Sequence, residues 1–226
     1  MGLLTKDGVV LAAGKRAGSV LLDVRSASER LYTIDSHVAC AVAGITSDAH
    51  TLLDSCRTES QRYLCTYHEK APVEHIVTRL CSLKHSYTQF GGLRPFGASF
   101  LIAGWDKELG FQLYHTDPSG NFNAWKAKPM GANSSASQAV LNDAYKESGA
   151  ANLTVEKARA VAVKALSKAM DATLTPDQLE VAVLTLREDG KGTEYKLLPH
   201  AEITELLGAV KKEMDEEKAK EAAGDI

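Results

Sequence analysis

The chain has 226 residues, a formal net charge of −3 and 44% hydrophobic residues. This length allows one large hydrophobic core, and no linker rich in Pro, Gly and Ser divides it, so one domain is expected. The small net charge gives no broad electrostatic footprint for nucleic acid or an anionic membrane. No apolar run approaches the roughly 18 residues of a membrane span and no leader pattern opens the chain, which predicts a soluble intracellular protein.

The first predicted elements are strands. Residues 9–13 are an apolar run after the turn signal Asp7-Gly8, which is typical of a buried strand. Residues 30–34 and 37–42 flank Asp35-Ser36 and predict a hairpin with a two-residue corner.

Two helices are predicted next. The first begins at Thr46 or Ser47 as N-cap, with Asp48 in its first turn. The second follows Pro72, which suits a first helical position. The stripe expected to be buried on the first helix comprises Ala49, Leu52, Leu53, Cys56, Ser60 and Leu64, and that on the second comprises Val73, Ile76, Val77, Leu80, Leu83 and Tyr87.

The rest of the chain repeats this order of strands and then helices. Strands are expected at residues 99–105, 111–116 and 126–130, helices at 134–148 and 154–171, a hairpin at 179–186 and 194–198 around residues 189–192, and a last helix from 201 to 210. Residues 211–218 are charged without an apolar stripe, which predicts a solvated or frayed extension. We therefore divide the chain into a folded domain, 1–210, and a charged extension, 211–226.

This order of elements predicts the fold class. Two antiparallel sheets, each covered by helices on one face and by the other sheet on the second, give an α+β fold, a four-layer αββα sandwich.

The four cysteines do not suggest a metal site. Cys40, Cys56, Cys65 and Cys81 lack C-x-x-C spacing and have no histidine array around them. Reduced thiols are the better interpretation, with three of them serving as small core hydrophobes on helix faces. No metal and no cofactor is predicted.

Two motifs carry the most information. The first is a helix end followed by a stop and a strand, in which Gly91-Gly92 allows a turn and Gly97 allows close backbone approach; its key residues are Tyr87, Gln89, Phe90, Gly91, Gly92, Arg94, Pro95, Phe96 and Gly97. The second is a hairpin turn of Asp117, Pro118, Ser119 and Gly120. Asp117 and Ser119 could be imagined as half of a catalytic triad, but hydrogen bonds that form the turn are favoured.

Together with residues 43–49 upstream, these motifs resemble the α-type subunits of the 20S proteasome over nearly the whole chain. Residues 43–49, 61–64 and 104–107 look most like one paralogous group, that of the third ring position. The resemblance implies the fold of the N-terminal-nucleophile hydrolases, in a non-catalytic form.

In catalytic relatives a terminal Thr attacks the peptide bond, with its own amino group as base. The alternative reading is such a β-type threonine peptidase, processed at Thr5. Against it, the resemblance places Gly14 where relatives carry an orienting Asp, and Arg30 where they carry a Lys that can shuttle a proton. No other catalytic motif is present, so no catalytic residue is predicted.

The resemblance implies a structural and regulatory role in protein degradation, both ubiquitin-dependent and ubiquitin-independent. The implied partners are neighbouring α subunits, β-ring subunits, proteasome activators and the 19S regulatory particle, in cytoplasm and nucleus. The surfaces around the first helix and the loop from Gly91 to Gly97 are expected to be ring contacts. The implied pocket for an activator's C-terminal tail has Arg30 as its cation and Gly44 as its wall; the alternative for Arg30 is a surface cation paired with Glu29 or Asp35.

Family α subunits carry roughly 30 further residues ahead of this point, including a gating tail. We therefore expect that the sequence starts at an internal Met. A third reading makes the chain a general interaction module that works through its charged residues 211–221, against which a solvated tail is favoured.

Overall fold

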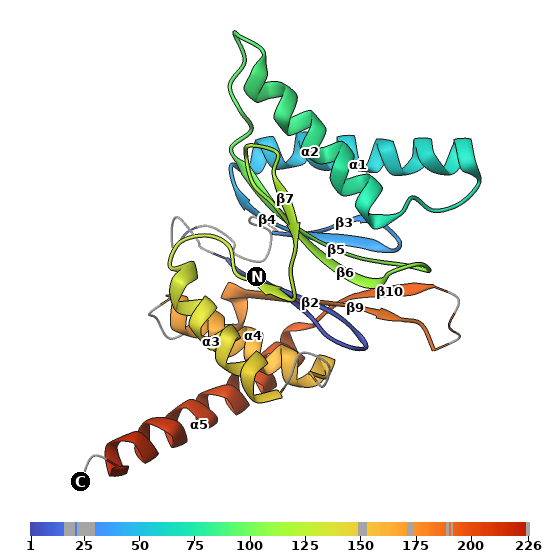
Figure 1. Ribbon diagram of the computed structural model, residues 1–226. Coiled ribbons are helices and arrows are strands. Elements are labelled where there is room, and N and C mark those ends of the chain that lie inside the picture. The colour runs from blue at the N-terminus through green and yellow to red at the C-terminus, as the bar shows by residue number, and fades with distance from the viewer. Residues whose placement is uncertain are drawn as a thin grey trace.

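The computed structural model describes residues 1–15, 21, 30–148, 153–170, 174–188, 190 and 192–224. Two five-stranded antiparallel sheets face each other, and helices cover the outer face of each sheet (Figure 1). This arrangement agrees with the predicted αββα sandwich.

The first sheet contains the chain's N-terminal hairpin. Its strands, in spatial order, are β10 (Thr193–Leu197), β9 (Leu179–Leu186), β2 (Gly8–Gly14), β1 (Gly2–Leu4) and β8 (Ala127–Lys128). The predicted hairpin of β9 and β10 is confirmed, although Asp189 and Lys191 in its turn lie outside the described residues. The strand predicted over residues 126–130 is shorter than expected.

The second sheet follows chain order, because each of its strands pairs with the next. It consists of β3 (Leu31–Asp35), β4 (Val38–Gly44), β5 (Ala98–Asp106), β6 (Gly110–Thr116) and β7 (Phe122–Ala124). Both predicted hairpins of this sheet, β3–β4 and β5–β6, are confirmed.

In the described part of the chain, five helices and one short 3₁₀ turn complete the fold. They are α1 (Thr46–Tyr67), α2 (Val73–Gln89), α3 (Ser134–Ser148), α4 (Val155–Met170), η1 (Pro176–Gln178) and α5 (His200–Gly224). Helices α1 and α2 lie on the second sheet, and α3 and α4 lie on the first, while α5 extends away from the body (Figure 1). Asp171, the predicted end of the helix at 154–171, lies outside the described residues.

Three clusters of buried side chains fill the spaces between the four layers. One lies between α1–α2 and the second sheet, and another between the first sheet and α3, α4 and α5. The third lies between the sheets and is rich in small residues: Val9, Leu11, Ala13, Leu31, Ala39, Ala41, Leu101, Ala103, Leu113 and Ala182. The layers are therefore held together by apolar burial on both faces of each sheet.

Helix α1 begins differently from the prediction. Its N-cap is Ile45, and no side chain caps it; the predicted caps, Thr46 and Ser47, are the first two helical residues. The carboxylate of Asp48 in the first turn is bound instead by a later loop, described below. Leu64, predicted to be buried, lies in the last turn of the helix and is 38% exposed.

Three of the four cysteines are buried, as predicted, but not all three lie on helices. Cys40, Cys56 and Cys81 are buried free thiols, and Cys65 is exposed. Cys40, however, belongs to strand β4 and not to a helix. Burial raises the pKa of the Cys56 thiol to about 12 and that of Cys81 to about 11, so both stay protonated at neutral pH.

Helix α5 is continuous across the predicted domain boundary. Val210 is buried, and the amino group of Lys211 donates to the carbonyl of Leu174 at 3.4 Å. The boundary at 210 therefore falls inside one helix. Among the described residues no helix is long and apolar enough to cross a membrane.

Candidate functional site

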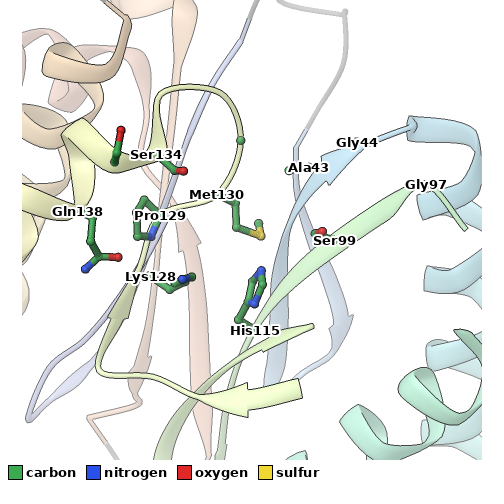
Figure 2. A pocket seen from close by; sticks show the side chains of 12 residues that line it. Ala43, Gly44, Gly97, Ser99, His115, Lys128, Pro129, Met130, Ser134 and Gln138 are labelled. Atoms are coloured by element: carbon green, nitrogen blue, oxygen red, sulfur yellow. The ribbon is translucent and has the colours of Figure 1, made fainter. Parts of the chain in front are cut away.

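A cavity of about 540 Å³ opens where the two sheets and α3 meet. Figure 2 shows that its walls come from the ends of β4 and β5, from β6, and from the segment that joins β8 to α3. The described residues that line it are Ala43, Gly44, Gly97, Ser99, His115, Lys128, Pro129, Met130, Gly131, Ser134, Ser135 and Gln138. None of these is acidic, so the fixed charge in the wall is positive.

Lys128 and His115 are the titratable groups of this cavity. The ammonium of Lys128 lies over the Trp125 ring, 4.0 Å from the centroid, which holds the cation against the β8 side of the wall. Burial and the charge of Lys128 lower the pKa of His115, so its imidazole is neutral at neutral pH. The site thus carries one cation and a neutral hydrogen-bonding ring.

Gly44 and Gly97, predicted from sequence, form one wall together. Gly44 has φ +115°, and a Cβ added there would lie 2.2 Å from the carbonyl oxygen of Gly97. The same carbonyl accepts a hydrogen bond from the Ile45 amide at 2.9 Å. The corner between β4 and α1 is therefore tight, and only glycine fits at position 44.

Arg30 lies in a neighbouring cavity of about 200 Å³, which Gly14 and Met1 also line. The two cavities share Ala43, Met130 and Gly131. Among the described residues, Arg30 Nε is buried without a hydrogen-bond partner. Of the predicted alternative partners, Glu29 lies outside the described residues, and Asp35 accepts hydrogen bonds from Ser36 and Ser60.

The structure brings together the positions that the resemblance compared with catalytic residues. Gly14 and Arg30 share one cavity, but they supply neither a carboxylate nor a lysine amine. The cavity's one hydroxyl among the described residues belongs to Ser137, and it donates to the Ala165 carbonyl at 2.9 Å. Among its described residues, the cavity therefore offers neither a carboxylate nor a lysine amine beside a hydroxyl that could act as a nucleophile.

Thr5 is far from this cavity along the hairpin. It lies beyond the end of β1, in the turn that joins β1 to β2. Its hydroxyl donates to the Gly8 carbonyl at 2.8 Å, and the side chain is buried. Because Gly14 is at the opposite end of β2, Thr5 cannot act together with it.

An ion pair fixes the first sequence motif against α1. The guanidinium of Arg94 binds the Asp48 carboxylate in a bidentate manner, at 2.6 and 2.8 Å, and the Gly97 amide donates to the same carboxylate at 2.9 Å. The hydrogen bonds from Arg94 and Gly97 lower the pKa of Asp48 to about 2. This arrangement explains why Arg94 and Gly97 occur in one motif: both bind the first turn of the same helix.

The remaining motif residues divide into a packed part and an exposed part. Tyr87 packs on Phe96 with ring centroids 4.4 Å apart. Gln89 hydrogen-bonds His85, and Phe90 is 65% exposed. Gly91, Gly92 and Pro95 are also exposed, and Gly92 has φ +86°. The loop therefore presents apolar surface while its two ends are held.

The second motif is a turn, as predicted. Asp117 Oδ1 accepts hydrogen bonds from the amide and hydroxyl of Ser119 and from the amide of Asn121. The Gly120 amide donates to the Asp117 carbonyl at 3.2 Å, and Pro118 is exposed. One oxygen of the Asp117 carboxylate therefore accepts three hydrogen bonds that shape the turn.

A buried lysine that sequence reasoning missed joins the two motifs. Lys84 on α2 is 0% exposed, and its ammonium donates to the Ala98 carbonyl at 3.0 Å, to Thr116 Oγ1 at 2.7 Å and to the Asp117 carbonyl at 3.3 Å. It also lies 4.8 Å from the centroid of the Phe100 ring. Burial lowers its pKa from 10.5 to about 8.

The spacing could have revealed this lysine. Lys84 follows Leu80 by four residues, so it belongs to the buried stripe of α2 despite its charge. Asp48 carried no comparable signal, because its partner Arg94 comes from a distant segment. Among the described residues, no group of His, Cys, Asp and Glu could hold a metal ion.

The comparisons with known proteins agree with this fold. The family model for the proteasome subunit matches residues 1–184. The chain belongs to the proteasome subunit family.

Within this family the chain is similar to α-type members. It is 50% identical over 208 residues to "Proteasome subunit alpha type-4" of Spinacia oleracea and, over the same length, to "Proteasome subunit alpha type-4-A" of Arabidopsis thaliana; each alignment covers 92% of this chain and 81% of the relative. The type-4 protein of Petunia hybrida is 51% identical over 187 residues, which cover 82% of this chain and 74% of the relative. The predicted resemblance to α-type subunits, and to the alpha type-4 group, is confirmed. The β-type alternative is not favoured.

Proposed function

We propose that the chain is a non-catalytic α-ring subunit of the 20S proteasome core particle. The observation that carries this proposal is the 50% identity over 92% of the chain to proteins named proteasome subunit alpha type-4. In this role the chain contributes shape and contact area to the outer ring, for ubiquitin-dependent and ubiquitin-independent protein degradation. Its partners are neighbouring α subunits and β-ring subunits, and the cytoplasm and nucleus are its proposed locations.

The absence of peptidase activity is part of the proposal. It is supported by Gly14 and Arg30 in the cavity where catalytic relatives have Asp and Lys, and by the buried, hydrogen-bonded hydroxyl of Thr5. The test of assembly is size-exclusion chromatography of native extract that contains the tagged chain. Co-migration with a particle of many subunits is expected; elution only as a monomer would contradict the proposal.

Replacing Thr5 by alanine is expected to leave peptide hydrolysis by the assembled particle unchanged, because Thr5 is a turn residue with no free amino group. The measurement is cleavage of a fluorogenic peptide by particles purified through the tagged chain. Cleavage by the purified monomer that Thr5→Ala abolishes would establish the threonine peptidase reading instead.

We also propose that activators and the 19S regulatory particle dock beside this chain, with Arg30 as the cation for a terminal carboxylate and Gly44 in the wall. Support comes from the buried Arg30 Nε, which lacks a hydrogen-bond partner among the described residues, and from the tight corner at Gly44. Arg30 and Gly44 line adjacent cavities within one chain. The proposal therefore needs an activator tail that spans both cavities.

Arg30→Ala is expected to weaken activator docking roughly 10- to 150-fold, since a hydrogen bond to a charged group contributes about 1.5–3 kcal/mol. The measurement is activator-stimulated peptide hydrolysis as a function of activator concentration, with basal hydrolysis and co-migration unchanged. Lys128→Ala is the comparison variant, because it removes the cation of the neighbouring cavity, which the tail would also cross. If only Lys128→Ala weakens docking, Arg30 is not the carboxylate partner.

A further inference from the structure

A groove of about 320 Å³ runs between α1 and α2, the two helices that form the outer layer on the second sheet. Its walls include Ser55, Ser82 and Leu83 and the charged residues Glu59, Arg62 and Arg79. This groove is separate from both cavities described above, which lie at the edge between the sheets.

The charges in the groove are layered by depth. The Glu59 side chain is only 13% exposed, whereas those of Arg62 and Arg79 are 63% and 55% exposed. Burial raises the pKa of Glu59, but the hydrogen bond with His75 and the charges of Arg79 and Arg62 lower it by more than burial raises it. The net pKa of Glu59 is below its ordinary value, so the carboxylate is ionised at neutral pH. An incoming group therefore meets two cations before it meets the acid.

Glu59 uses only part of each guanidinium. It binds Arg62 through Nη1 at 2.8 Å and Arg79 through Nε at 3.2 Å. Within the described part of the chain, neither guanidinium donates a hydrogen bond to any other acceptor. Because a guanidinium carries five N–H donors in a rigid fork, each arginine retains donors for a second acceptor while Glu59 holds it in place.

We propose that this groove is a docking site for a carboxylate side chain, Asp or Glu, of an adjoining proteasome subunit. The inference rests on the proposed assembly function, and it adds the chemistry of one contact. The argument is charge complementarity: the two exposed cations of Arg62 and Arg79 surround the one buried anion of Glu59, which leaves a formal net charge of +1 on these three side chains. The apolar wall at Leu83 would exclude water from the contact, which strengthens the ionic hydrogen bonds.

Glu59 acts here as a positioning residue. Two arginines on facing helices would repel each other and spread apart in its absence, since like charges at this separation are unfavourable. With Glu59 between them, both forks stay over the groove. An acidic partner then completes a network of alternating charge, which a solvated helix face would not need.

The test uses cells that express two tagged copies, wild type and variant, in equal amounts. The ratio of the two in purified particles measures competition for one ring position. The double substitution Arg62→Gln and Arg79→Gln is expected to incorporate at least fivefold less than wild type. Arg57→Gln is the matched control: Arg57 is also on α1 and 43% exposed, but it binds Asp54 and the Thr33 carbonyl, both outside the groove.

Equal incorporation of the double variant and the Arg57→Gln control would overturn the inference. If the double variant melts at a lower temperature than the control, the pair Arg62→Lys and Arg79→Lys decides. These lysines keep the charge but lose the bidentate fork, so a partial loss of incorporation supports the inference and wild-type incorporation overturns it. If wild type itself is missing from the particle, the proposed function fails, and the docking site falls with it.

Discussion

Replacing Gly44 by alanine is expected to destabilise the chain by about 2–6 kcal/mol. Two costs add: a positive φ is strained for a residue with a side chain, at about 1–3 kcal/mol, and an inserted methyl in a packed site costs a further 1–3 kcal/mol or so. The second cost is high because the obstacle, 2.2 Å away, is the backbone carbonyl oxygen of Gly97, which also accepts a hydrogen bond from the Ile45 amide. Urea unfolding of the purified chain measures the change.

Gly92→Ala provides the control, because Gly92 also has positive φ but nothing lies within 4 Å of its added Cβ. It should cost only the backbone strain. If the two variants are equally stable, the close approach of Gly44 and Gly97 does not constrain the corner between β4 and α1. The cavity wall that these two glycines form can then adapt to an added side chain.

The second large effect concerns Lys84 and alkaline pH. The folded chain lowers the pKa of Lys84 from 10.5 to about 8. Between these pH values the unfolded chain still binds the proton and the folded chain has released it, so stability must rise with pH in this window. Relative to Lys84→Met, wild type should therefore gain about 3 kcal/mol between pH 8 and pH 10.5.

The measurement is the difference in free energy of unfolding between wild type and Lys84→Met at several pH values. Tyrosines and cysteines titrate in the same range, but they are common to both chains and cancel in the difference. If this difference in free energy does not change with pH, burial does not lower the pKa of Lys84 in the folded chain. Its contacts with Ala98, Thr116 and Asp117 would then balance the loss of water.

The sequence was sufficient to predict the layers and most elements, but the short strand β7 and the turn η1 were not predicted. Local signals were enough here, because apolar period and turn residues act within a few positions; the helix at 134–148 was predicted with the bounds that the structure has. The prediction failed where a residue from a distant segment took the place of a local hydrogen-bond partner. Helix α1 takes no side-chain N-cap because the loop at Arg94 and Gly97 reaches the first turn and binds Asp48.

The candidate site was only partly predictable for the same reason. The two sequence motifs were correct as a helix end and a turn, but their connection through Lys84 depends on tertiary contacts. Arg30 and Gly44 were expected in one pocket, and within this chain they line adjacent ones. Lys128 and His115 come together from strands that lie in different sheets, which no spacing in the sequence could indicate.

The small residues between the sheets have a wider consequence. Half of that layer is alanine, namely Ala13, Ala39, Ala41, Ala103 and Ala182. The methyl groups of neighbouring alanines cannot change rotamer to accommodate a larger side chain. A larger residue at any of these positions must therefore push the two sheets apart. Both cavities lie at the margin of this seam, and Ala13 and Ala41 line one of them. The distance between the two sheets therefore sets the width of both cavities. Substitutions within this layer, even far from either cavity, would change the shape of both.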